Sequence, residues 1–117
     1  MLIKLKIPNS ISEHTLVTYS NSGWVVADQT SHFGVLLSNS DERKPIEGDD
    51  ENSLAMVMFQ GRFQARAAET IPDGGGPIEV VNGEVRVGTT SSIGFILPLI
   101  EGQPSRVAGD LVEIIIR

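Results

Sequence analysis

The stretch from Leu54 to Ala68 constrains the possible fold more than any other part of the sequence. Its odd positions form an unbroken apolar face, and its even positions are apolar up to Met58 but polar afterwards. Because a strand has a period of two residues, this pattern predicts a long strand, buried on both faces in its first half and on one face in its second. Gly61, which has no side chain, would allow the strand to bend between the two halves.

A helix is the alternative for the same stretch. Asn52 or Ser53 could cap it, and Ala, Leu and Met all favour helices. The apolar residues from Leu54 to Phe59 would surround a helix on all sides, however, and the alternation after Gly61 fits a strand better. We therefore expect a strand.

Further short strands are predicted along the rest of the chain, separated by turn-forming residues about every 10 to 15 positions. The pattern is typical of an all-β fold: a small antiparallel β-barrel or compact β-sandwich of about eight short strands with little or no helix. The β-prone runs are Leu2 to Ile7, His14 to Tyr19, Trp24 to Ala27, Phe33 to Leu37, Ile78 to Val87, Ser92 to Leu97 and Leu111 to Arg117.

The run from Ile78 to Val87 carries the strongest local signal. Asn82 and Gly83 accept the positive φ angles of a two-residue hairpin turn. Pairing across that turn collects aliphatic residues on one face and sets Glu79 opposite Arg86 on the other. The sequence therefore predicts a β-hairpin here.

Two of the predicted strands resemble each other. The run from Ile93 to Leu97 repeats the pattern of Phe33 to Leu37, with a Gly in second place between apolar residues. This likeness predicts two similar strands in equivalent places of the fold.

Length, cysteine content and charge limit the class of protein. A chain of 117 residues suffices for one domain, residues 1–117, that buries about two thirds of its unfolded surface. It has no Cys, which excludes disulfides, thiolate metal sites and cysteine nucleophiles. Its sequence has neither a membrane span nor a signal peptide, so we expect a soluble protein made in the cytoplasm. A net charge of −6 disfavours direct binding to nucleic acid.

The acidic segment from Ser38 to Ser53 is the one shift in composition. Six acidic and two basic residues leave it at −4, out of −6 for the chain. A calcium loop would need alternating ligands and a distal Glu, which the order DERKPIEGDDEN lacks, so we expect an exposed surface loop. The glycine run from Pro72 to Pro77 lacks the Lys and hydroxyl residue of a phosphate loop and predicts a turn.

Chemically active residues are few. His14 and His32 have no second ligand at a metal-binding spacing, and no Ser lies in a strand-turn-helix elbow. We expect no catalytic residue, no metal and no cofactor, and hence no enzyme. An acid-base enzyme stays open as an alternative, because any two of the 15 acidic residues could meet in the fold.

The order of these motifs resembles the capsid cement or decoration proteins of tailed bacteriophages. The resemblance runs from about Trp24 to Arg117. It consists of the Gly-Val-Leu strand, the long strand with a central Gly, an Ala-rich exit, a hairpin, an Ile-Gly strand and an Ala-Gly-Asp-Leu-Val closing strand. The sequence departs from the pattern in the acidic segment and in the strand from Leu2 to Ile7.

This resemblance implies a structural role. It implies a β-barrel-like subunit, usually a homotrimer, that binds the major capsid protein outside the head and stiffens it against DNA pressure. The protein would be made in the host cytoplasm and reside on the outer capsid surface of the virion. A stand-alone β-barrel that binds a peptide or small molecule is the alternative.

Two surfaces are the candidates for contact. The N-terminal region often engages the capsid in the family that the sequence resembles, and residues 1–8 could form an extended arm; an ordinary first strand is the alternative. The other surface is the polar face of the long strand, for which a merely solvated strand face is the alternative. The arm would contact the capsid through Leu2, Ile3, Lys4, Leu5, Lys6 and Ile7, and the polar face consists of Gln60, Arg62, Gln64 and Arg66.

Overall fold

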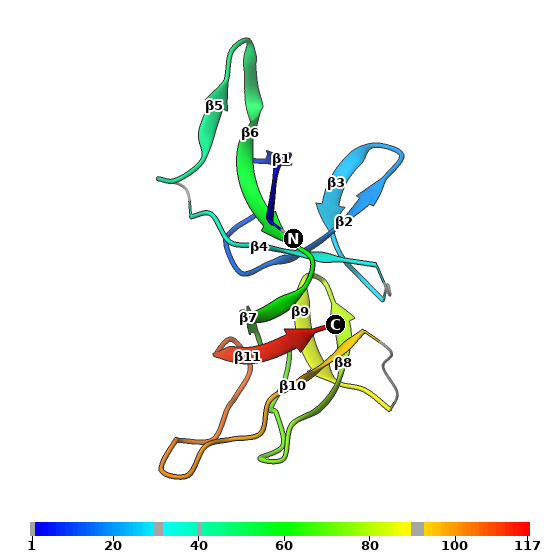
Figure 1. Ribbon diagram of the computed structural model, residues 1–117, viewed down its shortest axis with the longest axis vertical. Helices are drawn as coiled ribbons and strands as arrows, with labels where there is room; N and C mark the ends of the chain where they lie inside the picture. Colours follow the sequence, from blue (N-terminus) through cyan, green and yellow to red (C-terminus); the bar gives the residue numbers. More distant parts are fainter. Residues whose placement is uncertain (1, 30–31, 40, 90–92) are drawn as a thin grey trace.

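The fold is entirely β in the part of the chain that the structure describes. The computed structural model describes residues 2–29, 32–39, 41–89 and 93–117, and these contain eleven strands and no helix (Figure 1). The strands are β1 (Leu2–Pro8), β2 (Leu16–Ser20), β3 (Gly23–Val26), β4 (Gly34–Leu36), β5 (Lys44–Ile46), β6 (Asp49–Met58), β7 (Gly61–Arg66), β8 (Gly76–Val81), β9 (Glu84–Val87), β10 (Gly94–Ile96) and β11 (Leu111–Ile116). The predicted all-β class is therefore confirmed, although the predicted number of strands was too small.

The strands form two antiparallel sheets that are not closed into a barrel, consistent with a sandwich. The first sheet has the order β1-β6-β4-β2-β3, with β5 also paired to β6. The second has the order β7-β11-β10-β8-β9. The two orders are the same when each strand of the first sheet is replaced by its counterpart in the second. The counterparts of β1, β2, β3, β4 and β6 are β7, β8, β9, β10 and β11, respectively. The fold thus consists of two equivalent halves, residues 2–58 and residues 61–116, with β5 present only in the first.

Individual hydrogen bonds repeat in the two halves. The N–H of Ala27 donates to the carbonyl oxygen of Leu16 at 2.9 Å, and the N–H of Gly88 donates to that of Pro77 at the same distance. These bonds close equivalent positions of the hairpins β2–β3 and β8–β9. The equivalence therefore extends from strand order to individual residues.

The likeness between the two Gly-containing runs follows from this duplication. β4 and β10 each occupy the middle of their sheet. A Cβ on Gly34 would come within 2.5 Å of Cγ1 of Val57, and a Cβ on Gly94 would collide with the carbonyl oxygen of Ile115. Each glycine thus permits the close approach of a neighbouring strand, β6 in the first sheet and its counterpart β11 in the second, which confirms the predicted equivalence.

The predicted long strand is instead two strands in different sheets, so that prediction was wrong. β6 ends at Met58, the chain crosses over Phe59 and Gln60, and β7 begins at Gly61 with a φ of +122°. The first part is also not buried on both faces, since Leu54 is 37 % exposed and Met56 is half-buried. Period-two alternation continues across the crossing, which is why the sequence alone did not reveal it. The predicted apolar face is buried at Ala55, Val57, Phe63, Ala65 and Ala67.

The hairpin predicted around Asn82 and Gly83 is confirmed. Their φ angles are 48° and 76°, as a two-residue turn with left-handed backbone requires. Glu79 pairs with Arg86 in the register, and Nε of Arg86 donates to Oε1 of Glu79 at 2.8 Å. This ion pair raises the pKa of Arg86, and the carboxylate of Glu69 adds to the effect.

The acidic segment does not form the irregular loop that was predicted. β5 and the first part of β6 pair as a hairpin around Gly48, whose φ is +79°. In Figure 1 this hairpin extends beyond the rest of the first sheet at the top of the molecule. Its tip is exposed at Glu47 and Asp50, so the expected exposure was right and the expected lack of strands was wrong.

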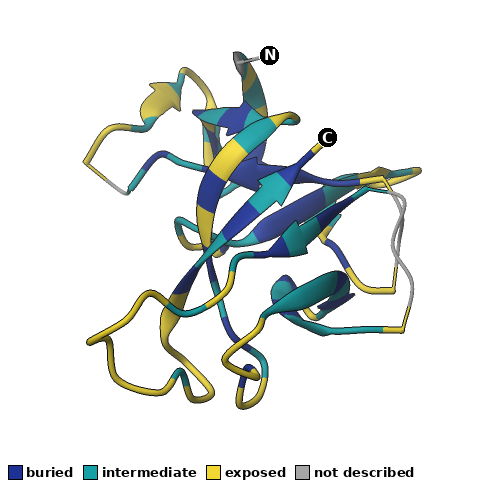
Figure 2. Ribbon diagram, turned by 60° about the horizontal axis from the view of Figure 1, so that its bottom comes forward, coloured by how far each residue is buried: buried dark blue, intermediate teal, exposed yellow. Residues whose placement is uncertain are grey.

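The core of the molecule consists of two hydrophobic clusters. Figure 2 shows the buried residues in the strands and the exposed residues mainly in the connections. The smaller cluster contains only residues of the first half, whereas the larger one contains the second half together with Leu16, Ala27, Phe33 and Val35 of the first. The second half is therefore covered by the first.

Candidate functional site

The polar face of β7 lies on the surface as the sequence predicted. Arg62 and Gln64 are exposed, and Gln60 is exposed in the crossing before the strand. The guanidinium of Arg62 forms an ion pair with the carboxylate of Glu113 on the neighbouring strand β11. A surface pair of this kind contributes little to stability and leaves both side chains accessible to a partner.

Arg66 has a structural role at the end of the same strand. Its Nη1 donates to the carbonyl oxygen of Glu13 at 2.7 Å, which ties β7 to the β1–β2 connection of the first half. Arg66 is thus half-buried and held against the first half by its side chain.

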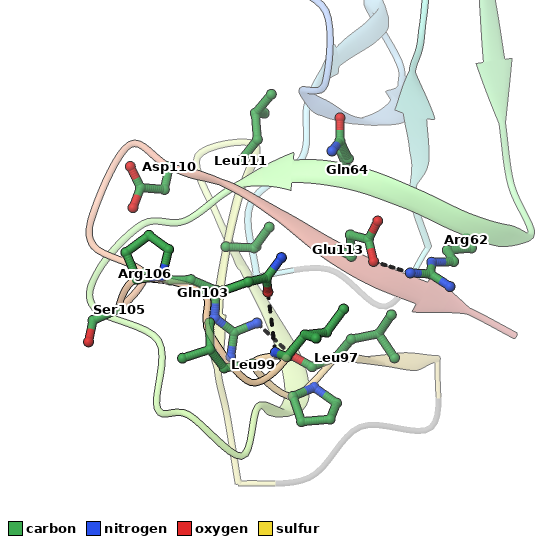
Figure 3. Close-up of a pocket in the computed structure, with 14 residues that line it drawn as sticks. Arg62, Gln64, Leu97, Leu99, Gln103, Ser105, Arg106, Asp110, Leu111 and Glu113 are labelled. Atoms are coloured by element: carbon green, nitrogen blue, oxygen red, sulfur yellow. Dashed lines mark hydrogen bonds and ion pairs between the residues drawn. The ribbon is translucent and has the colours of Figure 1, made fainter.

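A hollow of about 470 Å³ adjoins Arg62 and Gln64 (Figure 3). Its opposite side is formed by residues 97–110, which connect β10 to β11. Arg106 holds this connection in place, since its guanidinium donates to the carbonyl oxygens of Leu97 and, at 2.9 Å, Pro72. The sequence pattern predicts only turn-forming residues between these two strands and does not reveal their contribution to the surface.

The charged groups around the hollow are occupied by partners from the chain itself. Asp110 accepts a bond from the N–H of Val107 at 2.9 Å, and Glu113 pairs with Arg62. Among residues 2–29, 32–39, 41–89 and 93–117, no group of three or more His, Asp or Glu side chains could hold a metal ion. The arrangement is suited to surface contact, since its polar groups do not converge on a common point.

The predicted N-terminal contact residues form β1, which pairs with β6 over its full length from Leu2 opposite Met58 to Pro8 opposite Asn52. These residues thus form the ordinary first strand that was the alternative to an arm. Lys4 and Lys6 are exposed, Ile3 and Leu5 are half-buried, and Ile7 is fully buried. Among the described side chains of residues 3–7, the two lysines are thus the exposed ones; the side chain of Leu2 lies outside the described part.

Lys6 contributes to a small charged network on β6. Its Nζ lies 3.6 Å from Oδ2 of Asp49. Bonds from the Asn52 side chain and from the N–H groups of Glu51 and Asn52 hold the pKa of the Asp49 carboxyl below its usual value, and Lys6 adds to this effect. The network stabilises the acidic hairpin next to its turn at Gly48.

The two candidate surfaces are the same position of the duplicated fold. In the first half, Ile3 of β1 pairs with Val57 of β6, and Val57 also pairs with Leu36 of β4. In the second half, Phe63 of β7 pairs with Ile114 of β11, and Ile114 also pairs with Ile96 of β10, the equivalent of Leu36. The outward positions Lys4 and Lys6 of β1 therefore correspond to Gln64 and Arg66 of β7. Both strands also lie at the edge of their sheet. The shared alternation of apolar and polar residues was the signal that could have revealed this.

An aromatic groove, which no pattern in the sequence revealed, lies between aromatic residues of the first half and Ile93, Ile116 and Arg117 of the second. The ring of Tyr19 contacts that of Trp24 at 5.5 Å between centroids, and Trp24 contacts Phe59 at 5.8 Å. These rings line a groove of about 410 Å³ together with His32 and Arg117. Tyr19 at its rim is 70 % exposed.

No helix in the described ranges is long and apolar enough to cross a membrane. A scan against protein-family models, a search of curated proteins and a search of solved structures found no match to this chain.

Proposed function

We propose that the protein is a structural component of the phage virion that binds the outside of the capsid and stabilises the head. The observation that carries this proposal is the presence of equivalent polar edge strands, β1 and β7, in the two halves. One chain then offers two similar surfaces, each of modest affinity. A capsid lattice presents many copies of one partner surface, so that contacts of this kind reinforce one another.

The charge distribution supports the major capsid protein as the partner. The chain carries −6 overall, yet Lys4, Lys6 and Arg62 are exposed on these edge strands. Exposed cations on an otherwise acidic protein favour an acidic protein surface as the partner. The same net charge argues against direct contact with nucleic acid.

Co-sedimentation with purified mature heads that lack the protein tests the proposal. We expect saturable binding by the wild type and at least about 10-fold weaker binding by Lys4→Glu/Lys6→Glu, because two contacts of reversed charge act in every copy. Glu47→Lys/Asp50→Lys, at the exposed tip of the acidic hairpin, is the matched control for charge. A wild-type protein that stays in the supernatant at micromolar concentration would contradict the proposal.

A binding module for a peptide is the second candidate, and the aromatic groove is the observation that favours it. Grooves lined by Tyr, Trp and Phe bind proline-rich peptides in extended form. Titration of such peptides against the fluorescence of Trp24, the one Trp in the sequence, tests this function. A saturable change with a micromolar midpoint would support it, and an unchanged spectrum would count against it.

A further inference from the structure

One of the two equivalent hairpin turns makes the contact between the halves. The turn of hairpin β8–β9 lies against the first half, where the N–H of Leu16 donates to the carbonyl oxygen of Gly83 at 3.0 Å. The N–H of Gly83 in turn donates to the carbonyl oxygen of Ala27 at 2.7 Å. Gln29 adds a bond from its N–H to the carbonyl oxygen of Val80 at 2.9 Å. The equivalent turn of hairpin β2–β3 lies at the right of Figure 1, away from the second sheet.

Two apolar surfaces meet in this contact. We call them the outer face, which belongs to the first half, and the open end, which belongs to the second. Every residue of both surfaces is at most 7 % exposed. The outer face consists of Leu16, Ala27 and Val35, and the open end consists of Phe63, Ala65, Val80 and Val85.

The equivalent surfaces at the two ends of the chain lack such cover. In the second half, the outer face is half-buried throughout. In the first half, the open end is half-buried at three positions and 70 % exposed at Tyr19. The second outer face consists of Pro77, Gly88 and Phe95, and the first open end consists of Ile3, Leu5, Tyr19 and Trp24.

We propose that these uncovered surfaces cover each other between two copies of the chain. The outer face of the second half in one copy packs on the open end of the first half in the next, which continues the internal contact from chain to chain. The internal contact, seen in the same structure, defines the occupant, since it shows which surface fits an open end of this fold. The aromatic groove of Tyr19 and Trp24 is then part of a subunit interface.

The small residues at this contact are compatible with the proposal. A Cβ on Gly83 would lie 2.5 Å from Cγ2 of Thr15, so the internal contact needs a Gly in the hairpin turn. Between copies the equivalent pair is Ser22 and Gly76. Between copies the turn carries the larger residue, Ser22, and the residue opposite it is Gly76 instead of Thr15. The pair therefore again combines one larger residue with one Gly.

One hydrogen bond of the internal contact is not repeated. The N–H of Leu16 donates to Gly83, but the equivalent residue Pro77 has no N–H. The contact between copies is therefore weaker than the internal one, and association should depend on concentration. Such a head-to-tail contact closes into a ring when the rotation per copy permits. A ring of three copies would contain six halves, joined alternately by internal contacts and contacts between copies.

Light scattering coupled to size exclusion tests the proposal, which goes beyond the proposed capsid binding and can be tested without heads. We expect the wild type to exceed the chain mass of 12.6 kDa, and Tyr19→Glu and Phe95→Glu each to raise the dissociation constant at least about 30-fold. Val107→Glu, at a position that is 50 % exposed outside both surfaces, is the control and should associate like the wild type.

Mixing the two monomeric variants gives the sharpest result. Tyr19→Glu keeps its outer face intact, and Phe95→Glu keeps its open end intact, so an equimolar mixture should form a dimer and nothing larger. Trp24 lies at the open end, and its emission should shift to shorter wavelength in that mixture. Pro77→Glu replaces Phe95→Glu as the second outer-face variant if the latter does not fold.

Three results would overturn the inference. They are a wild type that is monomeric at 100-fold the concentration used for head binding, association that both variants retain, and a mixture that stays monomeric. Co-sedimentation with heads is measured separately. Heads that bind no wild-type protein would contradict the capsid proposal and leave the contact between copies standing.

Discussion

The two halves of the molecule share five strands but differ in the connection before their last strand. In the first half, β5 pairs with the start of β6, and this acidic hairpin extends away from the body. In the second half, residues 97–110 contain no strand, fold back beside β7, and form one side of the hollow in Figure 3. The shared strands build the two cores, whereas the unequal connections shape two different surfaces. The two halves thus share the packing of their strands and differ in this connection, as surface connections commonly do.

The equivalent glycines of β4 and β10 should give the largest effect on stability. Gly94→Ala would set its Cβ against the backbone carbonyl of Ile115, which cannot move without disturbing the sheet. Gly34→Ala would meet the side chains of Val57 and Phe59, which can rotate. We expect losses of about 4 kcal/mol for Gly94→Ala and about 2 kcal/mol for Gly34→Ala, measured by denaturant unfolding. Equal losses would mean that the two close approaches do not differ.

The two cores can be compared through the equivalent residues Ile114 and Val57, both of which are fully buried. Ile114→Ala removes more side-chain volume from the larger cluster than Val57→Ala removes from the smaller. We expect losses of about 3.5 and 2 kcal/mol, respectively. Coincident unfolding transitions of each variant by fluorescence and circular dichroism would show that the halves unfold as one unit. Separate transitions would show that the two halves unfold independently.

The sequence predicted those parts of the fold that local chemistry decides. The turn at Asn82 and Gly83 needs left-handed backbone, and the pattern around it admits one register, so the hairpin was predicted pair by pair. The crossing at Phe59 and Gln60 was not predicted, because alternation is the same whether a strand continues or a new one begins in another sheet. A strand break that leaves the period intact is determined by tertiary pairing alone.

The candidate surfaces were predicted as residues but not as a pair. Lys4, Arg62 and Gln64 were identified by their outward positions, which are confirmed as exposed. Their equivalence depends on the sheet order, to which no single motif points. The hollow and the aromatic groove combine residues from distant elements and could not be found from spacing.

The connection between the halves gives a prediction of intermediate size. Gly61 has a φ of +122°, which other residues rarely adopt, while the nearest atom to an added Cβ is Cζ of Phe63 at 3.5 Å. Gly61→Val should therefore lose about 1 to 3 kcal/mol through backbone strain without a steric clash. Gly48→Val, in the exposed hairpin turn with a φ of +79°, is the matched control for strain away from both cores. A melting curve unchanged by Gly61→Val would mean that the crossing tolerates a different backbone geometry.

The smallest predicted effect concerns the acidic hairpin that only the first half has. The carboxylate of Asp49 accepts bonds from the Asn52 side chain and from N–H groups of β6, which hold its pKa below the ordinary value of 3.8. A carboxyl group with a lower pKa in the folded state contributes stability above its unfolded pKa, and this contribution disappears as the pH falls through the folded pKa. Asp49→Asn should therefore destabilise the hairpin next to its turn at neutral pH. The difference from the wild type should begin to shrink near pH 4 and disappear once the pH is below the folded pKa of Asp49. Amide hydrogen exchange of Glu51 and Asn52 between pH 7 and pH 3 measures this locally, with Asp50→Asn as the control carboxylate on the same strand. A difference between Asp49→Asn and the wild type that persists undiminished at pH 3 would show that the ionised carboxylate is not what stabilises the hairpin.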